Sequence, residues 1–292
     1  MSNDPIELCT HYLQSGDLDR AEGTIRQLLA KNPQHVQGLC LLGLIRQTRG
    51  QLDEALGLFK AAAGRDPQSA AAYNHMGALF IQARQADEAI ACLEQALRLA
   101  PFFPEAYNNL GKAYLVHKRE ADALACFREA VHLRPSFEEA LNNLALIHIA
   151  RREFDEARPL LERLVQTAPA LPGPLVGLSL IHVEKGELEQ ALSLAQQAVQ
   201  LNAQLPMVRD QLGFVLLKMG RAEEAAAHFR AALQAAPQYA QANEHLGLAL
   251  SFLGRLDEAV AYLKRAVQLD PSNVRVQNNL SAVLARKDSL PK

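Results

Sequence analysis

The sequence contains no tryptophan, and aromatic residues make up only 5% of its 292 residues. Ala, Leu, Gln, Glu and Arg dominate instead. These residues are strong helix formers, whereas the β-branched and aromatic residues that favour strands are few. The hydrophobic fraction of 49% is ample for a core, and much of it is Ala, whose small side chain lets helices approach closely. The composition therefore favours an all-helical fold.

The sequence also lacks an excess of one charge, because 30 basic residues face 32 acidic ones. Nucleic-acid binding depends on a basic surface, and binding to anionic lipid depends on clustered Lys and Arg. We therefore expect no nucleic-acid partner. Residues 164–183 form an uncharged stretch of membrane-spanning length, but Pro169, Pro172 and Pro174 would break a helix there. We expect no membrane insertion.

The four cysteines form no CxxC pair and no zinc pattern, which favours buried free thiols in a reducing compartment (Cys9, Cys40, Cys92 and Cys126). The N-terminus is neither basic nor followed by an apolar stretch, so no secretory signal is expected. These features predict a cytoplasmic location, unless an export signal has been removed.

Sequence motifs for catalysis are missing as well. No phosphate-binding glycine loop, nucleophile elbow or HExxH motif occurs. His148 and His182 are separated by one repeat length, and we expect them to be neutral packing residues rather than metal ligands. The sequence predicts no enzyme activity, no cofactor and no metal site.

What the sequence does contain is a 34-residue period, and such repetition indicates a repeat architecture. Helix-breaking prolines recur at this step, with one position skipped: Pro33, Pro67, Pro101, Pro135, Pro169, Pro237 and Pro271. Alanine occupies a second column in every repeat: Ala21, Ala55, Ala89, Ala123, Ala157, Ala191, Ala225 and Ala259. A third column is always small: Gly43, Gly77, Gly111, Ala145, Ser179, Gly213, Gly247 and Ser281.

Each 34-residue unit is expected to be two short helices. The turn between them often has glycine, as at Gly50 and Gly220. The second helix often opens with Asp-Glu-Ala, as at Asp53 and Asp257, where an acidic residue suits the positive end of the helix dipole. Proline then ends the unit.

This pattern resembles the tetratricopeptide repeat family over essentially the whole chain. The resemblance implies an all-α, right-handed α–α superhelix, a solenoid of eight helix-turn-helix repeats with a C-terminal capping helix at 274–287. The repeats would be 2–35, 36–69, 70–103, 104–137, 138–171, 172–205, 206–239 and 240–273.

The repeat at 172–205 is the irregular one, because it begins Pro172-Gly173-Pro174 and has Gly177 within its first helix. We interpret it as a possible bend that divides the chain into an N-terminal block, 2–171, and a C-terminal block, 172–287, followed by a tail at 288–292. Pro159 also interrupts the preceding second helix. The alternative is an irregular but continuous stack.

The family resemblance implies that the first helices line a concave groove, with positions 2, 5, 6, 9, 12 and 13 of each repeat facing it. Positions 5 and 6 are rich in amides and imidazoles here: Asn74, His75, Asn108, Asn109, Asn142, Asn143, Gln211 and His245. An amide both donates and accepts hydrogen bonds, so such a column could hold the backbone of an extended peptide. It is similar to the asparagine column of O-linked N-acetylglucosamine transferases. The alternative is that these are consensus residues bonding locally.

Positions 9 and 12 are apolar instead, among them Leu146, Leu180, Phe214 and Leu217. An apolar stripe would suit the apolar face of a partner helix, although tight curvature could bury it between neighbouring first helices. Lys112 could meet a ligand carboxylate, and Phe102 could be an exposed hydrophobic anchor.

The leading hypothesis is a non-catalytic scaffold that binds a peptide or helix of a partner protein in the groove. A second is that the chain recruits substrates for a larger enzyme, such as a glycosyltransferase. A third is self-assembly. The sequence does not name the partner.

Overall fold

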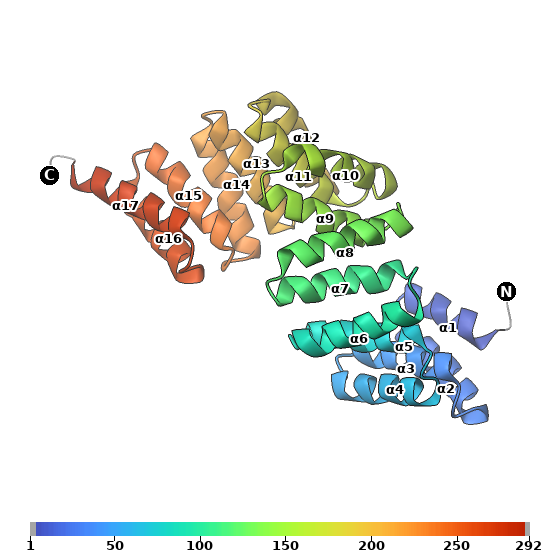
Figure 1. The fold of residues 1–292 in the computed structure, drawn as a ribbon. Coiled ribbons are helices and arrows are strands. Elements are labelled where there is room, and N and C mark those ends of the chain that lie inside the picture. The colour runs from blue at the N-terminus through green and yellow to red at the C-terminus, as the bar shows by residue number, and fades with distance from the viewer. Residues whose placement is uncertain (1–3, 290–292) are drawn as a thin grey trace. The chain divides into compact units, whose positions relative to one another are not determined.

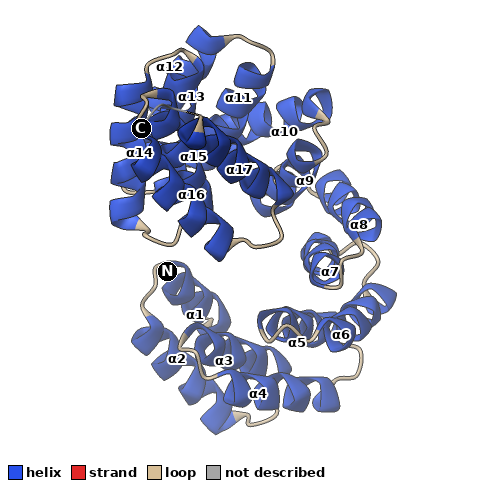
Figure 2. Ribbon diagram, turned by 90° about the vertical axis from the view of Figure 1, so that its left-hand side faces the viewer, coloured by secondary structure: helices blue, strands red, loops and turns tan. Residues whose placement is uncertain are grey.

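The computed structural model describes residues 4–289, and in this range the chain forms seventeen α-helices and no strand (Figures 1 and 2). The first helices of the repeats, with the final helix, are α1 (Pro5–Gln14), α3 (Val36–Thr48), α5 (Ala70–Gln82), α7 (Pro104–Val116), α9 (Glu138–Ala150), α11 (Pro172–Glu184), α13 (Pro206–Lys218), α15 (Ala240–Phe252) and α17 (Val274–Asp288). The second helices are α2 (Leu18–Lys31), α4 (Leu52–Arg65), α6 (Ala86–Leu99), α8 (Glu120–Leu133), α10 (Phe154–Thr167), α12 (Leu188–Leu201), α14 (Ala222–Ala235) and α16 (Leu256–Leu269).

The predicted period is confirmed. From α3 to α17, every first helix begins at the first position of a proposed repeat or, for α17, of the proposed cap. The first repeat is shortened, because α1 has 10 residues where the later first helices have 13. The chain is thus an all-α solenoid of helix hairpins that ends in a single capping helix.

The chain divides into two compact units, Met1–Leu144 and Ala145–Lys292, with the division inside α9. We call them the first and second unit and describe each by itself. The sequence places its block boundary elsewhere, at 171/172, and that boundary stays a prediction. In the second unit α11 packs on α10 and α12 packs on α13, so the stack continues through repeat 172–205.

The alanine and glycine columns mark where the two helices of a hairpin touch. All eight alanines of the second column are fully buried. The small residue of the third column faces a residue sixteen positions later: a Cβ on Gly111 would lie 2.6 Å from Phe127, and one on Gly213 would lie 2.7 Å from Phe229. Where that later residue is Ala195, the small one is Ser179. A small residue therefore stands where a larger side chain of the second helix packs against the first.

Every turn within a hairpin contains one residue of left-handed backbone at the same repeat position. Gly16, Gly50, Gly186, Gly220 and Gly254 have φ of 77 to 79°, while Arg84, Lys118 and Arg152 reach 58 to 62°. The left-handed region costs little only for glycine. The turn geometry is thus set by the repeat rather than by the residue.

The prolines of α10 and α11 do not interrupt these helices. α11 begins at Pro172 and carries Pro174 in its first turn, where a missing N–H leaves no hydrogen bond unmade. α10 continues through Pro159. Gly177 is also accommodated, because a Cβ there would lie 2.9 Å from Leu161.

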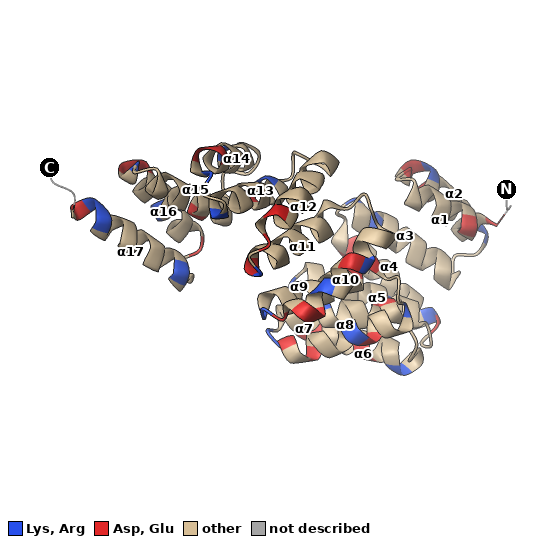
Figure 3. Cartoon of the chain, turned by 90° about the horizontal axis from the view of Figure 1, so that it is seen from above, with Lys and Arg blue, Asp and Glu red and all other residues tan. Residues whose placement is uncertain are grey.

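Charged residues of both signs are interspersed along the helices of each unit (Figure 3). Between residues 4 and 289, no helix is long and apolar enough to cross a bilayer. The four cysteines are free, and burial raises the pKa of Cys9 and Cys40 to about 11 and that of Cys126 to about 12. These thiols are therefore poor nucleophiles.

Candidate functional site

In the first unit, the amides of successive first helices bond to one another. Asn109 Nδ2 donates to Asn74 Oδ1 at 2.9 Å, and Asn143 Nδ2 donates to Asn108 Oδ1 at 3.0 Å. In each pair, position 5 of one repeat accepts from position 6 of the next, a separation of 35 in the sequence. We call such a pair a polar rung. The rungs join α5 to α7 and α7 to α9.

The two members of a rung differ in exposure. Asn74 and Asn108 are buried, Asn108 with only 1% of its surface exposed, whereas Asn109 and Asn143 are half-buried. The rung uses one N–H of each half-buried amide, which leaves its carbonyl oxygen and second N–H. Asn108 Nδ2 is buried and has no hydrogen-bond partner among the described residues. The half-buried amides of Asn109 and Asn143 are therefore held in place and keep unused hydrogen-bonding capacity, and we call them, with the half-buried Asn142, the amide face.

Two further predicted residues of this unit have partners of their own. Lys112 Nζ lies 2.9 Å from Glu139 Oε1, so the cation already has a carboxylate beside it. His75 stacks on Phe59 with ring centroids 5.2 Å apart. Burial lowers the pKa of His75 to about 4, so the ring is neutral near pH 7. The stacking of His75 fits the alternative of local bonding that the sequence left open for positions 5 and 6.

The second unit repeats the polar rungs with different chemistry. His245 Nδ1 lies 2.9 Å from Asp210 Oδ1, and Asn279 Nδ2 donates to Glu244 Oε1 at 2.8 Å. Glu244 Oε2 also accepts from Arg275 at 2.8 Å. Asp210, His245 and Glu244 are all buried. The repeat positions are those of the first unit, but the acceptors are carboxylates instead of amides.

An aromatic cluster lies on this second set of rungs. The ring of Phe214 stacks on His245 with a centroid distance of 4.9 Å and an interplanar angle of 21°. Lys218 Nζ lies 5.2 Å from the centre of the Phe214 ring. A cation over an aromatic face is attracted to it. We call Phe214, His245 and Lys218 the aromatic face.

The predicted apolar stripe is only partly exposed. Leu146 is exposed, and Leu180, Phe214 and Leu217 are half-buried, whereas Val183 is buried. Gln211 is buried too, and it donates to Ser179 Oγ at 3.1 Å, which in turn donates to the carbonyl of Ala191. Val176 stands at position 5 of α11 and offers no side-chain acceptor. Gln211 of α13 therefore donates to Ser179 of α11 instead.

The remaining residues singled out in the sequence are Phe102, His148 and His182. Phe102 is 84% exposed on the turn before α7, as expected for a surface anchor. His148 and His182 each contact a glutamate five residues later, Glu153 and Glu187. Among the described residues, no group of three His, Cys, Asp or Glu side chains is placed to hold a metal.

Sequence reasoning missed two features. The first is the rungs, because the 35-residue rung spacing is one position longer than the repeat, and columns read at the repeat length do not show it. The second feature is a buried ion pair between Glu22 and Arg46. A signal for it was present, because the same two positions in the next repeat hold Leu56 and Phe80, which pack in an apolar cluster.

Comparison with known families supports the repeat assignment. A model described as tetratricopeptide repeat matches residues 7–70, 76–136, 121–172 and 211–274, which is more than half of the chain. The chain belongs to the tetratricopeptide repeat family. Repeats of this family generally lack catalytic machinery, and membership supports a role as a protein-interaction scaffold. No curated protein matches the sequence.

Solved structures show where this tetratricopeptide repeat chain has similar folds. A crystal structure of the APC/C hetero-tetramer Cut9-Hcn1 matches 91% of the chain with a TM-score of 0.74 and 15% identity. The chain spans only 52% of that relative's length. TTC0263, a thermophilic TPR protein of Thermus thermophilus, matches 63% of this chain over its own full length, with a TM-score of 0.56 and 26% identity.

Proposed function

We propose that this protein binds an extended peptide segment of a partner protein on the amide face of the first unit. The observation that carries the proposal is the fixed amide pair Asn109 and Asn143. Each is oriented by a rung to a buried asparagine, and each retains one acceptor and one donor. A peptide unit offers the complementary N–H and C=O.

The spacing of these amides suits an extended chain. They occupy the same position of successive first helices, and packed helices lie about 8–10 Å apart. Three residues of extended chain rise about 10 Å. One peptide could therefore meet Asn109 and Asn143 with backbone groups three residues apart. Because the rungs hold the amides in place, little side-chain entropy is lost on binding.

The aromatic face of the second unit supports a second contact of different character. The half-buried Phe214, next to Leu217, offers apolar surface, and Lys218 adds a positive charge. This combination suits an apolar side chain or a helix face of the partner rather than its backbone. It is the observation that favours a helical partner as a second candidate.

The test begins with peptides selected on the whole chain from a random library. Binding of a selected peptide is measured by fluorescence anisotropy for the wild type, for Asn109→Ala with Asn143→Ala, and for Phe214→Ala. The double variant is expected to bind about tenfold more weakly or worse, because two hydrogen bonds are lost. Asn202→Ala, an exposed asparagine outside both faces, is the control.

A chemical variant of the peptide separates backbone from side-chain recognition. N-methylation of single backbone amides removes the donor without changing the side chains, and it is expected to weaken binding more than alanine substitution at the same residue. Circular dichroism verifies that each protein variant is folded. Selected peptides that bind the folded double variant as tightly as the wild type would remove the amide face from consideration.

A further inference from the structure

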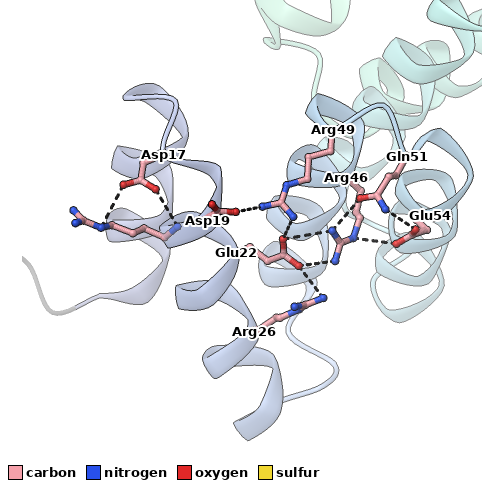
Figure 4. Close-up of polar contacts among 9 residues, drawn as sticks. Asp17, Asp19, Glu22, Arg26, Arg46, Arg49, Gln51 and Glu54 are labelled. Atoms are coloured by element: carbon pink, nitrogen blue, oxygen red, sulfur yellow. Dashed lines mark hydrogen bonds and ion pairs between the residues drawn. The ribbon is translucent and has the colours of Figure 1, made fainter.

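A polar recess of about 610 Å³ lies in the first unit, on elements that do not form the amide face (Figure 4). It is lined by α2, by the C-terminal end of α3 and by the start of α4. The residues that matter are Asp19, Glu22, Arg26, Arg46, Arg49 and Glu54. We call it the arginine recess.

Three arginines share one buried carboxylate in this recess. Glu22 is 6% exposed, and its Oε1 accepts a hydrogen bond from Arg46 at 2.6 Å and lies 2.8 Å from Arg26 Nη2. Its Oε2 lies 2.5 Å from Arg49 Nη1 in an ion pair. Burial alone would raise the pKa of Glu22, but the hydrogen bond and charge of Arg46, with the charges of Arg26 and Arg49, outweigh burial and lower it. Glu22 is therefore ionised near neutral pH.

Arg46 positions the others and has little left to offer. It is 8% exposed, its Nη2 donates to Glu22 and its Nη1 to Gln51, and its Nε lies 3.0 Å from Glu54 Oε2 in an ion pair. Replacing a buried ion pair by apolar residues is often neutral or stabilising, so stability does not explain why this repeat departs from the apolar pair Leu56 and Phe80. The presence of charged residues at these two positions therefore points to ligand binding.

Arg26 and Arg49 do have donors to spare. Arg26 has a side chain that is 63% exposed, and it forms an ion pair with Glu22 through one nitrogen. Arg49 forms an ion pair with Glu22 and donates a hydrogen bond to Asp19. A guanidinium group has five N–H donors in a planar fork, and two such groups fixed by one carboxylate are suited to an oxyanion.

The rim carboxylates can give way to a ligand. Asp19, whose side chain is 95% exposed, contacts Arg49 from the solvent side, and Glu54 is also mostly exposed. Without these two groups, three positive charges face the single negative charge of Glu22. Such exposed ion pairs contribute little stability, so displacing Asp19 costs little.

We propose that the arginine recess binds an oxyanion-bearing side chain of a partner protein, a phosphorylated residue or a carboxylate, through Arg26 and Arg49. The incoming oxyanion takes the place of Asp19 on Arg49. Glu22 and Arg46 act as positioning residues that hold the two ligand arginines at the recess. The recess shares no residue with the amide face or the aromatic face, so it does not depend on the proposed function.

The test uses the whole chain and four probes in isothermal titration calorimetry: inorganic phosphate, a short peptide with one phosphoserine, and the same peptide with Glu or Ser in that place. The phosphoserine or Glu peptide is expected to bind and the Ser peptide to bind at least tenfold more weakly. Arg26→Gln with Arg49→Gln should lower the affinity at least tenfold. Both arginines are partly exposed, so this variant is expected to fold, and circular dichroism verifies it.

Asp19→Asn should raise the affinity for the oxyanion probes about two- to fivefold, because it removes the carboxylate that competes for Arg49. The matched control is Asp155→Asn, since Asp155 contacts Lys185 at the equivalent repeat positions of the second unit. There the places of Glu22 and Arg46 hold Arg158 and His182, so binding should not change.

The proposal is overturned if neither the wild type nor Asp19→Asn binds any probe, or if the folded arginine variant binds as well as the wild type. Phosphate binding as tight as the phosphopeptide would overturn the assignment to a partner's side chain.

Discussion

The two units place their polar rungs at the same repeat positions but build them from different groups. In the first unit the acceptors are the neutral amides Asn74 and Asn108, and in the second they are the buried carboxylates Asp210 and Glu244. A buried carboxylate needs its partner far more than a buried amide does, because an uncompensated charge is costly to desolvate. The same repeat positions therefore carry fixed neutral amides in the first unit and partnered carboxylates in the second.

The comparison extends to the turns and to the imidazoles. Three of the second unit's four left-handed turn residues are glycines, whereas Arg84 and Lys118 adopt this backbone in the first. The imidazoles of His75 and His245 both stack on a phenylalanine ring, and His245 also has the Asp210 carboxylate as a partner. Among the described residues, the first unit has left-handed backbone at two residues other than glycine and the second unit at one.

The largest expected difference between the units is the loss of unfolding free energy when one polar rung is removed. His245→Ala should cost about 3–5 kcal/mol, because it leaves the buried Asp210 carboxylate without its partner. Asn143→Ala should cost only about 1–3 kcal/mol, because Asn108 Oδ1 is neutral. Hydrogen exchange read by mass spectrometry reports each unit separately, which matters because repeat arrays need not unfold in one step. His132→Ala, at an exposed histidine, is the control. Equal costs for the two rungs would break the comparison.

The next effect is a pH dependence of the first unit that arises from His75. The pKa of His75 is about 4 in the fold against an ordinary value near 6.5, so below pH 6.5 the unfolded chain binds a proton that the folded chain does not. The stability contributed by the neutral ring is present above pH 6.5 and is lost as the pH falls toward 4, by about 2–3 kcal/mol.

Urea denaturation of the wild type and of His75→Leu at pH 7 and pH 4.5 measures this pH dependence. The substitution should remove most of the first unit's additional loss at pH 4.5. If both proteins lose the same stability in that unit, another group is responsible.

The smallest effects have opposite signs in the two units. Lys118→Gly should stabilise the first unit by about 0.5–1 kcal/mol, because it relieves left-handed backbone at a φ of 62°. Gly220→Ala should destabilise the second unit by about 1 kcal/mol. No atom lies within 4 Å of a Cβ placed on Gly220, so the effect comes from the backbone alone. Thermal unfolding of the two variants gives the measurement, and a shift in the same direction for both would contradict this explanation of the turns.

Much of the fold was predictable from one sequence because its columns obey simple volume rules. A small residue such as Gly111 is required where Phe127 crosses, and Ala123 where the two helices touch. Each rule recurs up to eight times along the chain, so it can be read from this sequence alone. The helices continue through Pro159 and Gly177, since packing on neighbours maintains a helix that local propensity disfavours.

The candidate site was only partly predictable. The amides of Asn108 and Asn143 stand out as polar residues in the first helices, but their mutual bond depends on the offset between packed helices. Leu146 is exposed and Val183 is buried, although both are apolar groove positions, and their exposure depends on how neighbouring helices pack. Their roles in binding a partner stay predictions.

The sequence by itself determined the hairpin, its length and its repetition, because these depend on neighbours within one repeat unit. Only the tertiary structure decided which polar atoms remain unsatisfied, as at Asn108 Nδ2, and which charges converge, as Arg26, Arg46 and Arg49 do on Glu22. Most of these contacts join residues from different repeats, and their geometry is set by how whole helices pack rather than by the spacing of letters along the chain.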